Sequence, residues 1–143
     1  MRMTTSVLDH ISFGVTDIVR SRAFYDAVLS PLGIARLADA TEGTSTNCGY
    51  GRGGAPQFWI CQDPVDTPRP SDGMHLAFVA PDNAAVDAFY RAAMAAGGRD
   101  NGAPGIRAQY HPNYYAAFVI DPDGHHIEAV CHGPGKFEDQ FKS

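Results

Sequence analysis

Hydrophobic and polar residues alternate along two stretches of the chain that lie 65 positions apart. In Val7–Val15 the alternation places Phe13 on one face of a strand and His10 on the other. Residues 74–80 repeat the pattern, with His75 on the face opposite the apolar one. We therefore expect two similar strands, each with an apolar face and a mixed face that carries a histidine.

A helix is predicted after each of these strands. Thr16 and Asp17 offer an N-cap for a helix that runs to about Leu29, and residues 81–83 cap the second helix, which Gly97 and Gly98 close. Three short strands are expected in 34–60, the third being Gln57–Cys61, and one weak strand in 99–110. The residues expected on the buried stripes are Phe24, Ala27 and Val28 in the first helix and Val86, Phe89 and Ala93 in the second.

The segment Asp121–Val130 predicts a hairpin whose second strand carries an acidic residue. Its Asp-Pro-Asp-Gly sequence is a turn signal, because proline fixes φ and Gly124 supplies a positive φ. In the strand that follows, Glu128 shares a face with His126 and Val130. Burying a carboxylate in a short apolar strand is costly, and a metal ion or a paired cation would relieve that cost.

The two halves of the chain form an internal repeat. At a shift of 65 residues, eight of the 24 positions from His10 to Gly33 are identical, without a gap. Usage of the commonest residues at roughly 7% each would give about two identities by chance. Each half therefore reads as strand, helix and three strands. Two such units can cover each other's open sheet face.

The repeat suggests where a metal could bind. It places His10 and His75 at equivalent points of the two first strands, and the alternation of Glu128 allows all three side chains to face one hollow. Two imidazoles and one carboxylate suit Zn²⁺, Fe²⁺, Mn²⁺, Ni²⁺ or Co²⁺, and the set does not choose among them. The alternative is a sheet framework whose histidines and Glu128 are hydrogen-bonded to each other or to water.

Composition narrows the class of protein. The 143 residues are 44% hydrophobic and 19% charged, which is typical of one globular domain. The formal net charge of -5, without a basic cluster, argues against nucleic-acid binding, and no apolar run is long enough to span a membrane. Three widely spaced cysteines and an N-terminus without a signal-peptide core predict a cytoplasmic protein with reduced thiols.

These features together resemble the vicinal oxygen chelate superfamily, which includes glyoxalase I, extradiol dioxygenases, fosfomycin-resistance enzymes and bleomycin-sequestering proteins. The resemblance rests on the paired βαβββ units, the histidine that opens each half and the Asp-Pro-Asp-Gly-x-x-Ile-Glu ending, and it covers about 7–132. It implies an α+β fold in which two repeated βαβββ modules form a paired, cup-shaped mixed sheet. It also implies one divalent metal ion held by His10, His75 and Glu128, and a homodimer.

In this interpretation residues 1–143 form a single domain. Module one covers about 7–62, a proline-containing linker 63–73, module two about 74–132, and a tail 133–143. Phe137 and Phe141 could dock the tail as a short helix or pack against a second subunit.

One position departs from the family pattern. Glyoxalase I and the related epimerase take a further ligand from the last strand of the first module, where this chain has Trp59. Tryptophan has no lone pair for a metal. Gln57 shares the face of Trp59 and could replace the ligand only with a register shift of two residues. The set therefore resembles the arrangement of two histidines and one carboxylate in the dioxygenases and fosfomycin enzymes.

Further site residues are expected around the hollow. His111 or Tyr115 is a candidate for proton transfer, and either Tyr114 or Tyr115 must face the hollow. Trp59, Gln57 and Tyr114 are candidate walls of the substrate pocket. Core packing of one tyrosine and of Trp59 is the alternative.

Two functions follow from these expectations. The first is a glyoxalase-like metal-dependent enzyme, of lyase/isomerase or dioxygenase type, acting on a small substrate that chelates the ion through two adjacent oxygens. The second is a metal-free binding or resistance protein that sequesters a small aromatic or antibiotic ligand in the cup.

Overall fold

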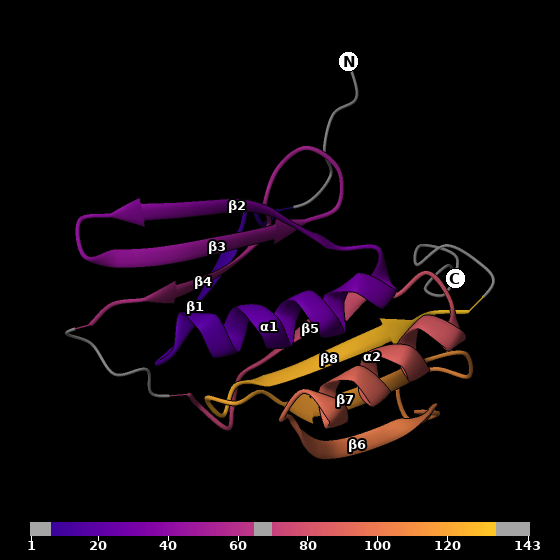
Figure 1. Ribbon diagram of the computed structural model, residues 1–143. Coiled ribbons are helices and arrows are strands. Elements are labelled where there is room, and N and C mark those ends of the chain that lie inside the picture. The colour runs from indigo at the N-terminus through magenta and orange to yellow at the C-terminus, as the bar shows by residue number, and fades with distance from the viewer. Residues whose placement is uncertain (1–6, 65–69, 134–143) are drawn as a thin grey trace.

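The computed structural model describes residues 7–64 and 70–133, and these form two copies of one βαβββ unit (Figure 1). A short 3-10 helix, Ser30–Leu32, follows the first helix. The first unit contains β1 (Ile11–Gly14), α1 (Ile18–Leu29), β2 (Ala35–Glu42), β3 (Ser45–Gly51) and β4 (Phe58–Gln62). The second contains β5 (His75–Val79), α2 (Asn83–Ala95), β6 (Arg99–Ile106), β7 (Tyr115–Ile120) and β8 (His126–Cys131). The expected α+β class and the two repeated modules are confirmed.

Each module has its own four-stranded mixed sheet. The strand order is β1-β4-β3-β2 in the first and β5-β8-β7-β6 in the second. β1 pairs with β4 and β5 with β8 in parallel, and the other neighbours are antiparallel. The edge strands β1 and β5 are therefore equivalent, and each lies beside the last strand of its own module.

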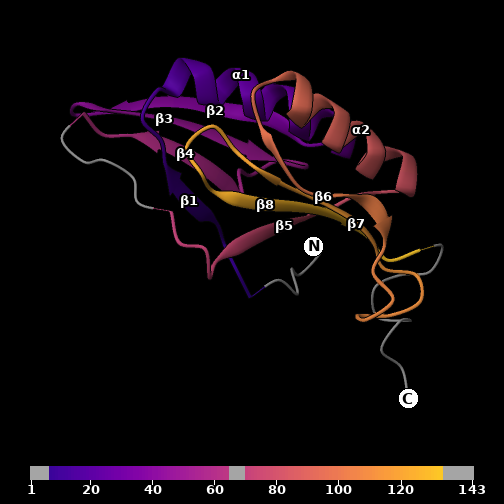
Figure 2. The same cartoon turned by 90° about the horizontal axis from the view of Figure 1, so that it is seen from below.

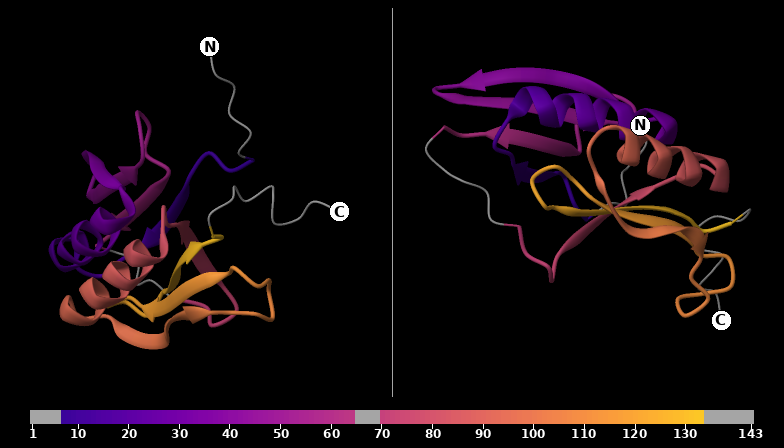
Figure 3. Two further views of the ribbon diagram at one scale, coloured as in Figure 1. Left: turned by 90° about the vertical axis from the view of Figure 1, so that its right-hand side faces the viewer. Right: turned by 60° about the horizontal axis from the view of Figure 1, so that its bottom comes forward.

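The two helices lie side by side on one side of the sheets (Figures 1 and 2). The core fills the space between them and the sheets, where the rings of Phe58 and Phe78 from different modules meet edge to face at 5.3 Å. The view from the side also places both helices together, with the opposite faces of the sheets turned away from them (Figure 3). The mixed face of each module therefore points away from the shared core.

The helix caps agree with the repeat. The Asp17 carboxylate accepts hydrogen bonds from the backbone N–H groups of Val19 and Arg20, and Asp82 accepts one from Ala85.

One position expected on the buried stripe of the first helix was wrong. Ala27 is exposed, and Tyr25 takes its place on the buried stripe because the aromatic side chain reaches a carboxylate in the other module.

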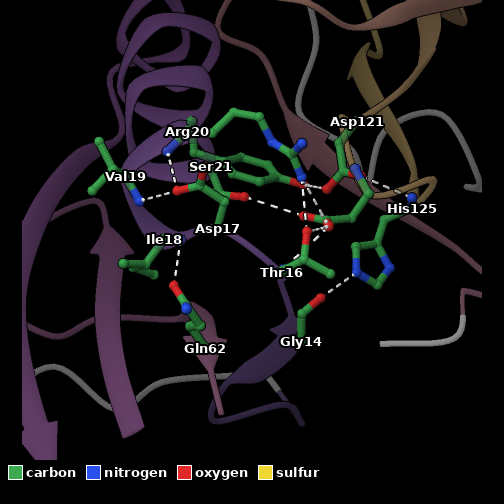
Figure 4. A network of polar contacts seen from close by, with 12 residues as sticks. Gly14, Thr16, Asp17, Ile18, Val19, Arg20, Ser21, Gln62, Asp121 and His125 are labelled. Carbon is green, nitrogen blue, oxygen red and sulfur yellow. Dashed lines mark hydrogen bonds and ion pairs between the residues drawn. The ribbon is translucent and has the colours of Figure 1, made fainter. Parts of the chain in front are cut away.

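The Asp-Pro-Asp-Gly turn joins the two modules as well as the two strands of its hairpin. One oxygen of Asp123 accepts hydrogen bonds from the Thr16 N–H at 3.1 Å, the Thr16 hydroxyl at 2.6 Å and the Arg20 guanidinium at 3.1 Å. The other oxygen accepts from the Ser21 hydroxyl at 3.2 Å. Figure 4 shows Thr16, Arg20 and Ser21 at the start of α1. We call Asp123 and these three residues the turn clasp.

Asp121 anchors the same turn from inside. Its carboxylate accepts a hydrogen bond from the Tyr25 hydroxyl at 2.5 Å and from the backbone N–H groups of Asp123 and His125. Burial raises the pKa of Asp121, against the opposing effect of these hydrogen bonds. Burial also raises the pKa of Tyr25, and the nearby Asp121 charge adds to that rise. The phenol therefore remains a donor at all working pH values.

Two further contacts between the modules are related by the repeat. His125 Nε2 donates to the carbonyl oxygen of Gly14 at 2.7 Å, at the end of β1. Arg52 donates to the carbonyl oxygen of Val79 at 2.9 Å, at the end of β5. Gly14 and Val79 are 65 positions apart and so are equivalent in the repeat. Each module therefore donates a hydrogen bond to the equivalent position of the other module.

No helix in the described part of the chain is long and apolar enough to cross a membrane. The expected docking of the tail by Phe137 and Phe141 concerns residues outside the described ranges, as does most of the predicted linker.

Candidate metal centre and ligand-binding face

The most buried acidic group of the second sheet is Glu128, in the middle of β8. Its side chain is 1% exposed, although it lies on the face away from the helices. Oε1 accepts a hydrogen bond from His75 Nε2 at 3.0 Å, and Oε2 accepts one from the Tyr114 hydroxyl. The cost of burying this carboxylate is therefore offset by two side-chain partners.

The spacing of His75 and Glu128 suits metal binding. With ligand distances of about 2.0–2.2 Å, two ligands of one Zn²⁺-like ion lie about 2.9 Å apart at a right angle and about 3.4 Å apart at the tetrahedral angle. The observed 3.0 Å lies within that range. These two side chains could hold one cation with little movement of the backbone.

Tyr114, not Tyr115, contacts the candidate site. Burial, together with the hydrogen bond to Glu128, raises the pKa of Tyr114, so its hydroxyl stays protonated and donates. The Tyr115 hydroxyl instead donates to Asp87 of α2 at 2.5 Å, and this hydrogen bond raises the pKa of Tyr115. Tyr115 therefore lies on the helix side of the sheet, away from Glu128.

His10 lies on the other module and does not join His75 and Glu128 within one chain. Its Nδ1 donates to the Asp9 carboxylate at 2.6 Å, and its side chain is 51% exposed. Across the described ranges, no three His, Cys, Asp or Glu side chains are grouped closely enough to hold a metal ion. The structure thus brings together two of the three predicted ligands, because His10 precedes β1 of the first sheet whereas His75 lies on β5 of the second.

Trp59 and His10 line the same hollow of about 230 Å³ on the open face of the first sheet. Gln57 does not reach this hollow. It lines a cleft of about 300 Å³ at the seam between the modules, to which His10 and Leu76 also contribute.

His111 forms a histidine pair that the sequence did not suggest. The Asn113 N–H donates to His111 Nδ1 at 3.1 Å, so the ring proton of a neutral His111 lies on Nε2. That proton is donated to His132 Nδ1 at 2.9 Å. Burial, with a smaller effect of His111, lowers the pKa of His132. The His111 ring lies 5.4 Å from the Tyr114 ring, which places the pair beside the Glu128 site.

Phe118 was also missed by sequence reasoning. It pairs with Glu128 across the β7–β8 ladder, and its ring lies 6.2 Å from that of His75 and 5.2 Å from the Arg107 guanidinium. The alternation along β7 could have found it, since Phe118 has the opposite parity to the buried Ala117 and Val119.

The fold and this face define a class of small α+β proteins built from two βαβββ modules. The model of the Glyoxalase/Bleomycin resistance protein/Dioxygenase superfamily matches residues 7–129. The chain belongs to this superfamily. No curated protein matches the chain.

Solved structures agree with this assignment. A glyoxalase/bleomycin resistance protein from Albidiferax ferrireducens T118 is 29% identical with a TM-score of 0.68, and the match covers 88% of this chain and 98% of that one. The fosfomycin resistance protein FosX from Listeria monocytogenes is 20% identical with a TM-score of 0.66, over 96% and 100% of the two chains. A glyoxalase I mutant from Zea mays is 20% identical with a TM-score of 0.67, over 86% of this chain and 46% of that one. At 20% identity the last two show the fold alone.

Proposed function

We propose that this chain is a glyoxalase-like metal-dependent enzyme, of lyase/isomerase or dioxygenase type, that acts on a small substrate with two adjacent oxygens. The observation that carries the proposal is the buried Glu128 carboxylate with His75 Nε2 3.0 Å away, on the face of the sheet that points away from the core. A bound divalent ion would supply Lewis acidity toward the two substrate oxygens.

The residues around the ion would have distinct tasks. Tyr114 holds Oε2 of Glu128, which leaves Oε1 and His75 Nε2 as the two ligand atoms. Asp9 orients the His10 ring through Nδ1, which leaves Nε2 as the ligand atom of a neutral imidazole. His111, next to the Tyr114 ring, remains the candidate for proton transfer, whereas the position of Tyr115 gives no support to that role.

A second copy of the chain would supply His10 to the ligand pair of the first, and this makes the proposed enzyme a homodimer. Within one chain His10 lies directly before β1 of the first sheet and His75 begins β5 of the second, yet the two side chains occupy equivalent positions in the repeat. Within the described residues, β1 and β5 are the edge strands of their sheets. Large apolar side chains are exposed beside these edges, namely Leu8 at 60%, Val79 at 58% and Met74 at 51%. Such side chains are typical of a surface that another chain covers.

The alternative is a metal-free binding or resistance protein that sequesters a small aromatic or antibiotic ligand. The hollow beside Trp59 favours it, as does the separation of His10 from the other two ligands within one chain.

A cytoplasmic setting belongs to either proposal and is supported by Cys48, Cys61 and Cys131, which are all free thiols.

Metal content tests the proposal. Protein purified without chelator should contain about one divalent ion per chain, and His75→Ala and His10→Ala should each lose it. Mixing the two variants and allowing subunits to exchange should restore part of the binding, since each mixed dimer would contain one intact site. Tyr115→Phe serves as a control. A metal-free wild type that binds a small aromatic ligand would support the alternative, and no recovery in the mixture would refute the shared site.

A further inference from the structure

Two rows on the open face of the first sheet consist of small side chains and one large ring. Ser12, Trp59, Gly49 and Ala38 are direct neighbours across the four strands and form one row. The next row, equally continuous, consists of Gly14, Cys61, Asn47 and Ala40. Directly opposed residues in a sheet point to the same face. Trp59 is therefore the only large side chain in these two rows.

The indole of Trp59 lies down over Gly49 instead of standing out from the sheet. A Cβ atom added at Gly49 would meet Trp59 Cη2 at 2.9 Å and Cε2 at 3.0 Å, and also Pro56 Cβ at 2.9 Å. Only glycine allows the ring to approach the backbone of β3 this closely. The ring is thus supported from below, and the hollow of about 230 Å³ lies beside it.

The lining of this hollow sets the charge of a ligand. Among the described residues that line the hollow, Glu42 carries the only formal charge, and the polar groups that accompany it are those of His10, Ser12 and Asn47. An anionic ligand would meet the Glu42 carboxylate, and the described part of the lining has no Lys or Arg to balance it. A neutral ring would avoid both this cost and repulsion by the divalent ion proposed at His10. A cationic ring would gain from the face of the indole, but that ion would repel it.

We infer that this hollow binds a planar aromatic group without negative charge, stacked on Trp59. The inference rests on the proposed function, since His10 borders the same hollow and would bring the ligand next to the proposed ion. It narrows the substrate class to molecules that carry a flat ring beside the two chelating oxygens. It also gives Gly49 a role in binding, because Gly49 makes room for the ring that forms the platform.

The test uses the fact that Trp59 is the only tryptophan in the sequence. Its fluorescence should be quenched saturably by 1-methylquinolinium and by quinoline, and calorimetry should give the same affinities. We expect decahydroquinoline, which is not planar, and 2-naphthalenesulfonate, which is anionic, to bind at least tenfold more weakly. Equal binding of the saturated and aromatic probes would overturn the inference, and so would the absence of saturable binding.

Two variants connect the binding to the platform. Trp59→Leu and Gly49→Ala should each weaken 1-methylquinolinium binding, measured by calorimetry, by about tenfold or more. Gly54→Ala is the matched control, because an added Cβ there meets nothing within 4 Å. Circular dichroism shows whether each variant folds, and the two different substitutions keep the test valid if one does not. Unchanged affinity in folded Gly49→Ala and Trp59→Leu refutes the platform.

Metal content separates the two proposals. Metal-free protein that still binds the aromatic probes would contradict the metal-dependent function and leave this inference standing. Protein that holds a stoichiometric ion but binds none of the probes would contradict this inference alone.

Discussion

Replacing Asp123 by alanine should destabilise the whole protein, although the residue lies in a turn that supplies no candidate metal ligand. The side chain is 2% exposed and accepts four hydrogen bonds from residues of the other module. Alanine removes the acceptor and leaves the donors at the start of α1 without this hydrogen-bond partner. Ser21 is fully buried, so water does not replace its partner.

The magnitude follows from the kinds of donor. Hydrogen bonds to charged groups contribute roughly 1.5–3 kcal/mol each in mutational series, and bonds in one cluster do not add. Arg20 is 44% exposed and Thr16 is exposed, so solvent compensates for much of their loss. We expect a decrease of about 3 kcal/mol in the free energy of unfolding. For a chain of this size that lowers the Tm by about 10 °C.

Urea unfolding measured by circular dichroism checks this expectation. The matched control is Asp72→Ala. The Asp72 side chain is fully exposed, and its ion pair, between Oδ1 and His126 Nε2 at 3.5 Å, is of the weak surface kind. The control should change stability by less than about 0.5 kcal/mol. If Asp123→Ala costs less than about 1 kcal/mol, or no more than the control, the turn clasp does not hold the modules together.

Three further predictions concern side chains near the candidate site and in the first module. Tyr114→Phe should weaken Zn²⁺ binding about tenfold in calorimetry, by releasing the glutamate ligand, while Tyr115→Phe leaves it unchanged; equal affinities would contradict this. Because folding lowers the pKa of His132, the unfolded chain binds a proton at a higher pH than the folded chain, so the free energy of unfolding is highest above pH 6.5 and falls as the pH drops through the folded pKa. His132→Asn should make the urea midpoint depend less on pH below 6.5. An unchanged dependence would contradict this prediction. Burial, together with the neighbouring Asp39, raises the pKa of the Cys48 thiol to about 12. At pH 8 iodoacetamide should therefore modify the less buried Cys61 before Cys48, as followed by mass spectrometry over time. The reverse order would contradict this prediction.

The modules could be predicted because their signals are local. Alternation around Phe13 and Phe78 gave the first strand of each module, and Asp17 and Asp82 marked the helix starts. Both depend on residues within one turn or one strand. The same reasoning misplaced Ala27 on the buried stripe, because Tyr25 is buried by a partner 96 residues away.

The site was less predictable, because it depends on how sheets and loops meet. Strand parity placed His75 and Glu128 on one face, and they do lie side by side. Parity says nothing about the distance between two sheets, so it could not show that His10 lies apart from them in one chain. The choice between Tyr114 and Tyr115 depended on where β7 begins, which propensity does not fix to one residue.

The reciprocal bonds from His125 and Arg52 have a consequence for how the molecule adapts to ligands. Each module is hydrogen-bonded to the end of the other module's first strand. The two modules of one subunit should therefore not open relative to each other, and they should unfold in one cooperative transition. Extra room for a bulky ligand would then have to come from side-chain rotation or from sliding between separate subunits.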